Sequence, residues 1–470
     1  MRLIYLLPFL PALAASIALP QPHLPARNAH PKRQTARVAS AVHNAVTALP
    51  KPGLPANALL VTGHSVDLLP VSPNTEINSD TYRTLTRQLP TVMTHAIESS
   101  KHSWEIGSLV ESLLEVYVPR LAPFEFSRAA FNADIPWAAL WVVEAWLKDY
   151  DWSGSPGNDN NPTSVVDLAQ YLDASTSPTG LWPKPLINGD GALGDPVAMG
   201  MGVWLLARYA MRPEVRSGLR SGLSSSQLAW ACGNQLAYLR QGATSDNGTI
   251  SQREGHFQLW ADMGSMIPPF PAYLGSDVSS DDLLRLGIDQ WQLESSALLD
   301  PSTGLYRHIN DFDPYFWATG NGWMLHGGLR VLASIEQAGR ADAFKTQIDD
   351  VRTTLGTVFT ALFAQLDSDG LLPNYMLHWD ESLGGGETAG TALVVAAYYR
   401  YIDMYPTAAT SSNTAAAARA FDGVVDKLDN SGWLTSVVNP MGPWVIDGAQ
   451  SPEGQSFVGM MWAARTKVGL

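Results

Sequence analysis

Apolar positions along most of this chain recur every three to four residues, which is the period of an amphipathic helix. The clearest stripe steps by four and three through Phe344, Ile348, Val351, Leu355, Val358 and Leu362. Two other segments, Pro136–Leu147 and Asp195–Met211, are apolar almost all round, so we expect them to be buried helices. No stretch shows the sustained alternation of a large sheet. The pattern therefore predicts an all-α fold.

The helical period begins at about Thr81 and predicts about a dozen helices. Besides the segments above, the expected helices are Trp104–Tyr117, Val165–Ala174, Ser224–Leu239, Ser280–Leu298, Asn321–Ile335, Thr388–Tyr401, Asn413–Leu428 and Pro452–Arg465. Long loops rich in Gly, Trp and Asp recur at the spacing of a helix pair: Gly180–Gly194, Gly242–Asp262, Asp300–Gly322 and Asp367–Gly386. This alternation favours a closed ring of helical hairpins with functional loops at one end. An α-solenoid is the alternative, but it would show a tighter repeated consensus.

The composition of the chain limits the classes of molecule that it can be expected to bind. The chain has 470 residues, of which 46% are hydrophobic, and a net charge of −14 from 30 Lys+Arg against 44 Asp+Glu. An acidic chain fits neither nucleic acid nor an anionic membrane surface, so we expect neither as a partner. Cys232 is the single cysteine, so no intrachain disulfide can form and a large core must carry the stability.

The N-terminal residues predict that the protein is secreted. Residues 1–18 combine a basic residue, an apolar run and small residues, which is typical of a secretory signal peptide. The run is too short and too interrupted by proline to span a bilayer. Residues 19–75 are rich in Pro, Ala, His and Arg and are interpreted as a leader or linker that can be processed. We therefore expect a secreted, extracellular protein whose catalytic domain covers residues 76–470.

Two acids are the first candidates for chemistry. Asp262 follows Trp260 by two residues and precedes a run that includes Met266, and Asp195 opens a predicted helix with Pro196 behind it. Ordinary helix capping is the alternative for both acids. Apolar neighbours would raise the pKa of Asp262 and keep its proton available, whereas a helix N-terminus would lower it. Two carboxylates facing one sugar are the usual minimum for glycoside chemistry, and tryptophan rings suit the faces of pyranoses.

Other chemistries have weaker signals. His308 lies between a glycine turn and the segment WATGNGW, but a lone histidine is more often structural. The run His378-Trp379-Asp380 lacks a second histidine at ligand spacing, so we expect no metal site and no cofactor. The chain has no Gly-x-Ser-x-Gly elbow, P-loop or dinucleotide-binding glycine pattern.

Several blocks resemble glycoside hydrolase family 105, the unsaturated rhamnogalacturonyl hydrolases. They are HFQLWADMGSMIPPFPAYLG, WATGNGWMLHGGLRVLASI, GDPVAMGMGVWLL, GGGETAGTALVVAAYYR and SPEGQSFVGMMWAA, and they run from about Trp104 to Arg465. The residues in these blocks are similar to those of the fungal branch of the family. The resemblance implies a six-hairpin (α/α)6 barrel that hydrates the 4,5-double bond of unsaturated galacturonyl residues in pectin oligosaccharides, as a monomer.

The resemblance also assigns roles. Asp262 matches the general acid/base and Asp195 the second carboxylate. His308, Trp260, Trp317, Asn321 and Trp323 match positions that line the pocket, and Met266 belongs to the same block. Gln252 stands where relatives commonly carry a sugar-binding His, for which His256 can substitute. Thr319 stands where bacterial relatives carry an Arg that can bind the uronate, so Arg253 or Arg307 would have to supply the charge. An unsaturated glucuronyl hydrolase, an ordinary glycosidase and a non-catalytic carbohydrate-binding barrel remain alternatives.

Overall fold

The computed structural model describes residues 60–62, 65–67, 71–157, 162–173, 180–189, 191–219, 221–378, 385–439, 441–446, 448 and 450–470. The predicted signal peptide, residues 1–18, lies outside these ranges, as does most of the predicted leader, residues 19–75. Trp379 and Asp380 also lie outside them.

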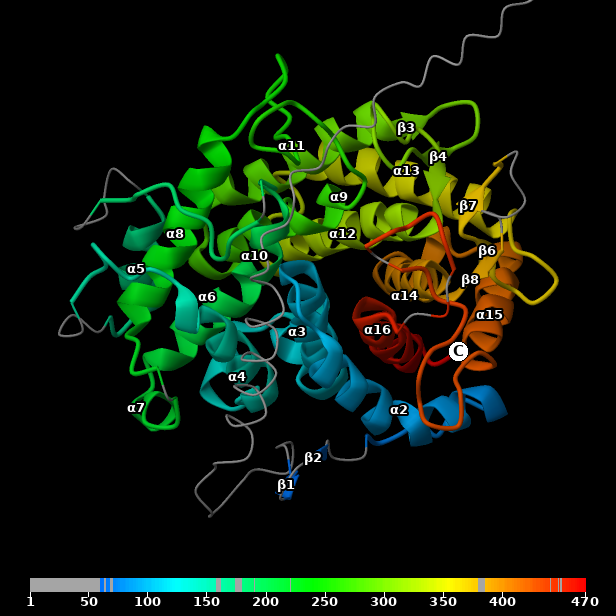
Figure 1. The fold of residues 1–470 in the computed structure, drawn as a ribbon, viewed down its shortest axis with the longest axis horizontal. Helices are drawn as coiled ribbons and strands as arrows, with labels where there is room; N and C mark the ends of the chain where they lie inside the picture. The colour runs from blue at the N-terminus through cyan, green and yellow to red at the C-terminus, as the bar shows by residue number, and fades with distance from the viewer. Residues whose placement is uncertain are drawn as a thin grey trace, which may run out of the picture.

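Twelve long helices in the described ranges form six consecutive pairs, each an outer helix followed by an inner one (Figure 1). The pairs are α2 (Asp80–Ser99) with α3 (Ser103–Tyr117), α4 (Trp137–Trp146) with α6 (Gly200–Ala210), α8 (Ser225–Gln241) with α10 (Pro269–Val278), α11 (Asp281–Leu298) with α12 (Ala318–Gln337), α13 (Lys345–Phe363) with α14 (Thr388–Met404), and α15 (Ser411–Val425) with α16 (Pro452–Val468).

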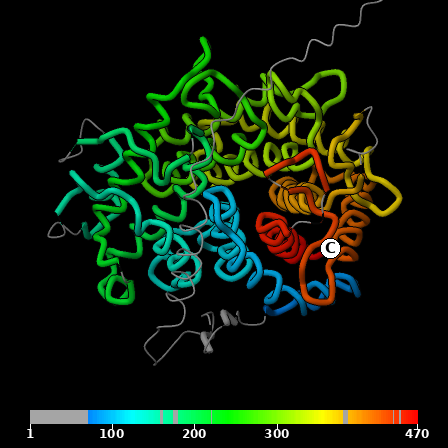
Figure 2. The backbone as a smooth tube through the Cα atoms, in the orientation of Figure 1, coloured from blue at the N-terminus to red at the C-terminus, as the bar shows by residue number. Residues whose placement is uncertain are grey.

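The inner helices form a closed ring. Each packs on the next in the order α3, α6, α10, α12, α14 and α16, and α16 packs back on α3 and α2. Figure 2 shows this closure, with the blue N-terminal helices beside the red C-terminal one. The closed ring of helical hairpins predicted from the sequence pattern is therefore confirmed, and it is the (α/α)6 barrel that the resemblance implies.

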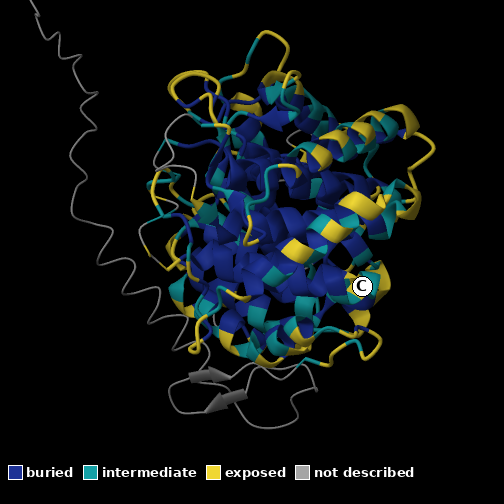
Figure 3. Cartoon of the chain, turned by 90° about the vertical axis from the view of Figure 1, so that its right-hand side faces the viewer, coloured by how far each residue is buried: buried dark blue, intermediate teal, exposed yellow. Residues whose placement is uncertain are grey.

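Burial separates the two layers as the sequence pattern requires. Outer helix α13 buries the predicted stripe of Ile348, Val351, Leu355, Val358 and Leu362, and its other face meets solvent. Inner helix α14 is buried from Thr388 to Ile402 because it has helices on all sides. Figure 3 shows the same division, with buried residues in the interior and exposed ones on the outer surface.

Shorter elements connect these helices. The remaining α-helices are α5 (Val165–Ala169), α7 (Pro213–Arg216) and α9 (Met263–Met266). The 3-10 turns are η1 (Pro119–Leu121), η2 (Pro123–Glu125), η3 (Arg128–Asn132), η4 (Leu147–Asp149), η5 (Gln170–Leu172), η6 (Asp195–Met199) and η8 (Pro406–Ala408). None of the described helices has the length and apolar character needed to cross a bilayer.

The strands are two or three residues long and form antiparallel pairs. They are β1 (Leu60–Thr62) with β2 (Ser65–Asp67), β3 (Leu299–Asp300) with β4 (Leu305–Tyr306), β5 (Phe316–Trp317) with β7 (Tyr375–Met376), and β6 (Leu372–Pro373) with β8 (Gly386–Glu387). The β1–β2 hairpin falls in the segment interpreted as a linker. The pairing of Trp317 with Tyr375 matters most, because it joins the loops before α12 and α14.

Two local predictions were wrong. The segment Asp195–Met211 does not begin as an α-helix capped by Asp195, because residues 195–199 form the 3-10 turn η6 and Gly194 precedes it. The Gly-Asn-Gly run at 320–322 is not a loop but the first turn of α12. It is helical because Asn321 bonds to backbone on both sides, accepting from Tyr306 N at 2.8 Å and donating to Trp317 O at 2.9 Å.

The starts of the inner helices meet at one end of the barrel. Trp104 in α3 donates its indole N–H to Glu453 in α16 at 2.8 Å, and Thr319 in α12 lies against Gly390 in α14. The loop before α6 lies against α9, which precedes α10. The long loops that precede the inner helices therefore gather there, as the sequence predicts.

Candidate active site

Asp262 occupies the N-cap position of α9, but its side chain accepts no capping hydrogen bond. The side chain is 19% exposed, and its Oδ2 atom is buried without a hydrogen-bond partner. Burial raises the pKa of this carboxyl, an effect only partly offset by His308. Capping therefore does not explain the residue, and Asp262 is poised to keep a proton that it can donate.

Asp195 lies beside it on a neighbouring loop. Gly194 fits so closely against α9 that a Cβ atom there would lie 1.8 Å from Sδ of Met263, the residue after Asp262. Asp195 is half-buried, and burial together with the charge of Asp262 raises its pKa to about 6. The two acids thus share one electrostatic environment.

Gln252 holds Asp195 in place. It is 2% exposed, and its Nε2 donates to Asp195 Oδ1 at 3.2 Å. Its backbone O accepts from Leu193 N at 2.7 Å, which ties the two loops together. The structure therefore gives Gln252 a positioning role, whereas the sequence suggested a direct contact with the sugar.

His308 connects Asp262 to a second, buried acid. Its Nε2 lies 3.7 Å from Asp262 Oδ2, while its Nδ1 lies 2.8 Å from Asp313 Oδ2 and 3.0 Å from the Tyr375 hydroxyl. Tyr375 and Trp444 also donate to Asp313 Oδ2, at 2.6 and 3.0 Å. Burial opposes ionisation of Asp313, but these hydrogen bonds, first that of His308, bring its pKa below the usual value. An ionised Asp313 fixes the Nδ1–H tautomer and leaves Nε2 facing Asp262.

Asp313 and Tyr375 were missed in the sequence. Asp313 stands in the run NDFDP, which is typical of a turn. Tyr375 reaches the site through the β5–β7 pair from a segment 67 residues after His308. Glu294 on α11 was missed as well: it is buried, and burial followed by the charge of Asp262 raises its pKa well above the usual value.

The predicted tryptophans lie at different depths. Trp317 is buried, with its ring centroid 4.5 Å from that of His308. Trp260 is half-buried, and its ring meets His308 edge-on at 5.8 Å. Trp323 is buried and packs edge-on against Phe457 at 4.9 Å, and Met266 is buried at the end of α9. Trp260 and Trp317 are therefore the two indoles in contact with His308.

Two other predicted contacts, Asn321 and His256, form no hydrogen bond or ion pair with Asp195 or Asp262 in the described ranges. Asn321 is fully buried, and its amide bonds to the backbone of Tyr306 and Trp317. It shapes the start of α12 and is not presented to a ligand. His256 is exposed, and its carbonyl accepts from the Ser251 hydroxyl at 3.0 Å.

The comparisons with known proteins bear on the family and on the fold. Residues 234–444, which include Asp262, His308 and Asp313, match the family model described as Glycosyl Hydrolase Family 88. The match, which covers less than half of the chain, and the barrel together indicate a glycoside hydrolase, as expected from the sequence. No curated protein matches the sequence.

Solved structures show the same barrel. A family 88 glycosyl hydrolase from Bacteroides vulgatus superposes with a TM-score of 0.53 at 16% identity, over 83% of the hydrolase and 100% of that chain. A protein described as a polysaccharide lyase gives 0.54 at 16% identity, over 83% and 98%. A possible family 105 member from Salmonella enterica gives 0.48 at 17% identity, over 73% and 94%. At these identities the first two likenesses show the fold and nothing more.

Of the two arginines considered from sequence, only Arg253 is available to an anionic substrate. Arg307 is ion-paired with Asp300 in the hydrolase. Arg253 is half-buried, and its guanidinium carbon lies 5.1 Å from the centre of the Trp260 ring. Thr319 is 5% exposed against the start of α14 and offers no charge.

Among the described residues, Glu111, Glu115 and His326 form the one group with the spacing of metal ligands. This group lies between α3 and α12, outside the site. Arg330 Nε lies 2.8 Å from Glu111 Oε2, and Arg400 Nη2 lies 2.8 Å from Glu115 Oε2. Because both carboxylates are already neutralised, the group is a poor match for a dication.

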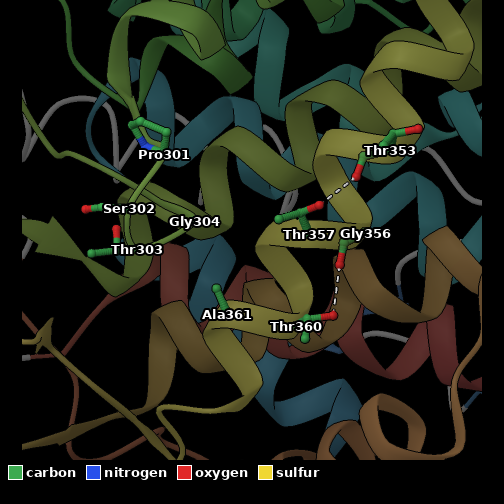
Figure 4. A pocket seen from close by; sticks show the side chains of 9 residues that line it. All are labelled: Pro301, Ser302, Thr303, Gly304, Thr353, Gly356, Thr357, Thr360 and Ala361. Atoms are coloured by element: carbon green, nitrogen blue, oxygen red, sulfur yellow. Dashed lines mark hydrogen bonds between the residues drawn. The ribbon is translucent and has the colours of Figure 1, made fainter.

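A surface hollow of about 580 Å³ lies elsewhere, between α13 and the β3–β4 turn. Figure 4 shows its lining of Pro301, Ser302, Thr303, Gly304, Thr353, Gly356, Thr357, Thr360 and Ala361. The α13 threonines donate to carbonyls of their own helix. The lining has no titratable side chain, so it supplies no acid–base chemistry.

Proposed function

We propose that the hydrolase hydrates the 4,5-double bond of unsaturated galacturonyl residues at the non-reducing end of rhamnogalacturonan oligosaccharides. The observation that carries the proposal is the Asp262 carboxyl, with a raised pKa and an unpartnered oxygen, facing His308 beside a second acid. The resemblance of the sequence blocks to family 105 supports the choice of substrate. The secretory leader predicted at residues 1–18 supports action outside the cell.

The first step transfers a proton from Asp262 to C4. The C4–C5 π electrons form the new C–H bond, and positive charge develops on C5 and the ring oxygen. A carboxyl whose pKa is raised by burial suits this step, because it still holds the proton that C4 receives. Asp195, ionised above its pKa of about 6, stabilises the cation as it forms.

Water then adds to C5. It forms the C5–O bond and gives a proton to Asp262, which restores the acid. The product is a hemiketal at C5, and opening of this hemiketal breaks the ring and expels the aglycone. One water is consumed overall and no redox partner is required. Asp313 holds His308 so that its Nε2 stays beside Asp262 Oδ2 through both proton transfers.

An ultraviolet assay tests the proposal. The protein is incubated with a disaccharide released from rhamnogalacturonan by a lyase, and the absorbance of the C4–C5 double bond is followed. We expect absorbance to fall, with products that have gained one water. Activity only on the glucuronyl analogue would favour a glucuronyl hydrolase, and cleavage of saturated substrates alone would favour an ordinary glycosidase.

Two further outcomes would overturn the proposal. A rise in absorbance from intact, saturated polymer would indicate β-elimination, the chemistry implied by the description of one structural neighbour as a polysaccharide lyase. Binding of the disaccharide without any change in absorbance would indicate a carbohydrate-binding barrel.

A further inference from the structure

We propose that Arg253 binds the carboxylate of the substrate and thereby makes the site specific for acidic sugars. This inference rests on the proposed function. The region around Asp262 holds three acids, Asp195, Asp262 and Asp313, which would repel a uronate in the absence of a nearby cation. Arginine recognises a carboxylate through two parallel N–H donors.

The position of Arg253 is fixed from two sides. Its backbone N–H donates to the Ser251 hydroxyl at 3.0 Å, and it forms an isolated bridge with Ala192, three residues before Asp195. On the other side its guanidinium lies over the Trp260 ring. The cation therefore lies between the Asp195 loop and an indole that contacts His308.

The guanidinium of Arg253 forms no ion pair with an acid of the described residues. No ion pair or side-chain hydrogen bond of Arg253 occurs within the described ranges, in contrast to Arg307, which is paired with Asp300. Stacking on Trp260 holds the guanidinium plane while leaving its N–H groups free for a ligand. Arg253 also acts on Asp195, where its charge opposes the pKa-raising effects of burial and of Asp262.

Other cations near the site are less suitable. His102 also acts on Asp195, but its ring lies 2.9 Å from Glu105 Oε1 and stacks on Trp104. Thr319 is buried against the start of α14 and offers no charge. Arg253 is therefore the cation that best suits a carboxylate here.

The test compares wild type with Arg253→Gln and Arg253→Lys, and uses Arg307→Gln as the matched control. Each protein is given the unsaturated galacturonyl disaccharide and its methyl ester, and kcat and KM are measured from the loss of double-bond absorbance. We expect Arg253→Gln to lower kcat/KM for the acid by about 10- to 100-fold, mostly through KM. The ester should change by less than about 3-fold, because it offers no charge to the arginine. Arg253→Lys should recover part of the loss, and Arg307→Gln should behave as wild type.

Equal losses on acid and ester, or no loss on either, would overturn the role of Arg253 while leaving the proposed function standing. If wild type consumes neither substrate, the proposed function fails. Calorimetric binding of a saturated galacturonate disaccharide then decides the inference alone: binding weakened by Arg253→Gln supports it, and unchanged or absent binding contradicts it.

Discussion

Two clusters of ionisable groups in this barrel contain similar residue types but have different roles. The acid cluster, Asp195, Asp262, His308 and Asp313, lies where the inner helices begin. The arginine cluster, Glu111, Glu115, His326, Arg330 and Arg400, lies further along α3, α12 and α14. Each combines carboxyls with one buried histidine.

The difference between the clusters is the partner of each carboxyl. In the arginine cluster burial opposes ionisation of both acids. Arg400 brings the pKa of Glu115 below its usual value, whereas the pKa of Glu111 stays raised beside Arg330. In the acid cluster no Lys or Arg forms an ion pair with Asp195, Asp262 or Asp313 within the described ranges, and the pKa values of Asp195 and Asp262 are raised. A permanently paired carboxylate stabilises structure, whereas an unpaired, partly exposed one can exchange protons with a substrate.

The largest expected effect is a loss of catalytic rate, without a loss of stability, when one carboxyl of the acid cluster is replaced. Asp262→Asn removes the proton donor with little change in shape, so we expect kcat to fall by about 10²- to 10⁴-fold with an unchanged urea midpoint. The absorbance assay measures the rate. Asp282→Asn, an exposed acid in α11, is the control and should keep full activity. A fully active Asp262→Asn enzyme would remove Asp262 from the chemistry.

Replacing an arginine of the arginine cluster should lower the stability of the protein and leave its catalytic rate nearly unchanged. Arg400→Met leaves Glu115 buried with only His326 nearby, which should cost roughly 3–5 kcal/mol of unfolding free energy. Urea denaturation measures the loss, and the folded fraction should keep kcat within about 3-fold. Adding Glu115→Leu should restore most of the stability, because the stranded charge is then gone. Arg87→Met, at an exposed site, should cost about 0.5 kcal/mol or less.

The fold was predictable because it depends on periodicity. The apolar stripe of α13 and the all-round apolar character of α4 specified an outer and a buried helix without any knowledge of tertiary contacts. A helix was expected after Asp262, but the bounds of inner helix α10 were not predicted, because Pro268, Pro269 and Pro271 obscure where it begins. In the structure Pro268 holds the N-cap position and the other two fall in the first turn, where proline is tolerated.

The site was only partly predictable because its parts meet through tertiary contacts. Asp262 and Asp195 could be singled out from the sequence because each stands next to the start of a predicted helix. Asp313 and Tyr375 carry no local signal, since their importance comes from a shared contact with His308. The free guanidinium of Arg253 could be separated from the paired one of Arg307 only once Asp300 was located.

A smaller loss of kcat should follow when His308 loses its contact with an ionised Asp313. Asp313→Asn removes the charge that fixes the Nδ1–H tautomer, so we expect kcat to fall on the order of 10- to 100-fold, less than in Asp262→Asn because Asp313 acts through another residue. The pH profile distinguishes this role from a general loss of stability, because the limb assigned to Asp262 should move while the urea midpoint stays nearly constant. Tyr375→Phe keeps the Asp313–His308 contact and should lose less activity than Asp313→Asn. An unmoved pH limb in Asp313→Asn would show that the imidazole needs no buried carboxylate.

The smallest expected effect is the pH dependence of stability due to Asp195. Its pKa of about 6 in the folded protein exceeds the ordinary value of 3.8, so the folded state holds the proton to higher pH than the unfolded state does. Unfolding free energy should therefore fall as pH rises through this interval and level off above it. For a half-buried group the fall is about 1–2 kcal/mol. Urea titrations at steps from pH 4 to pH 7 should show this loss in wild type and a shallower slope in Asp195→Asn. Parallel curves would mean that Asp195 is solvated like an ordinary surface acid, and the contrast between the two clusters would then rest on Asp262 alone.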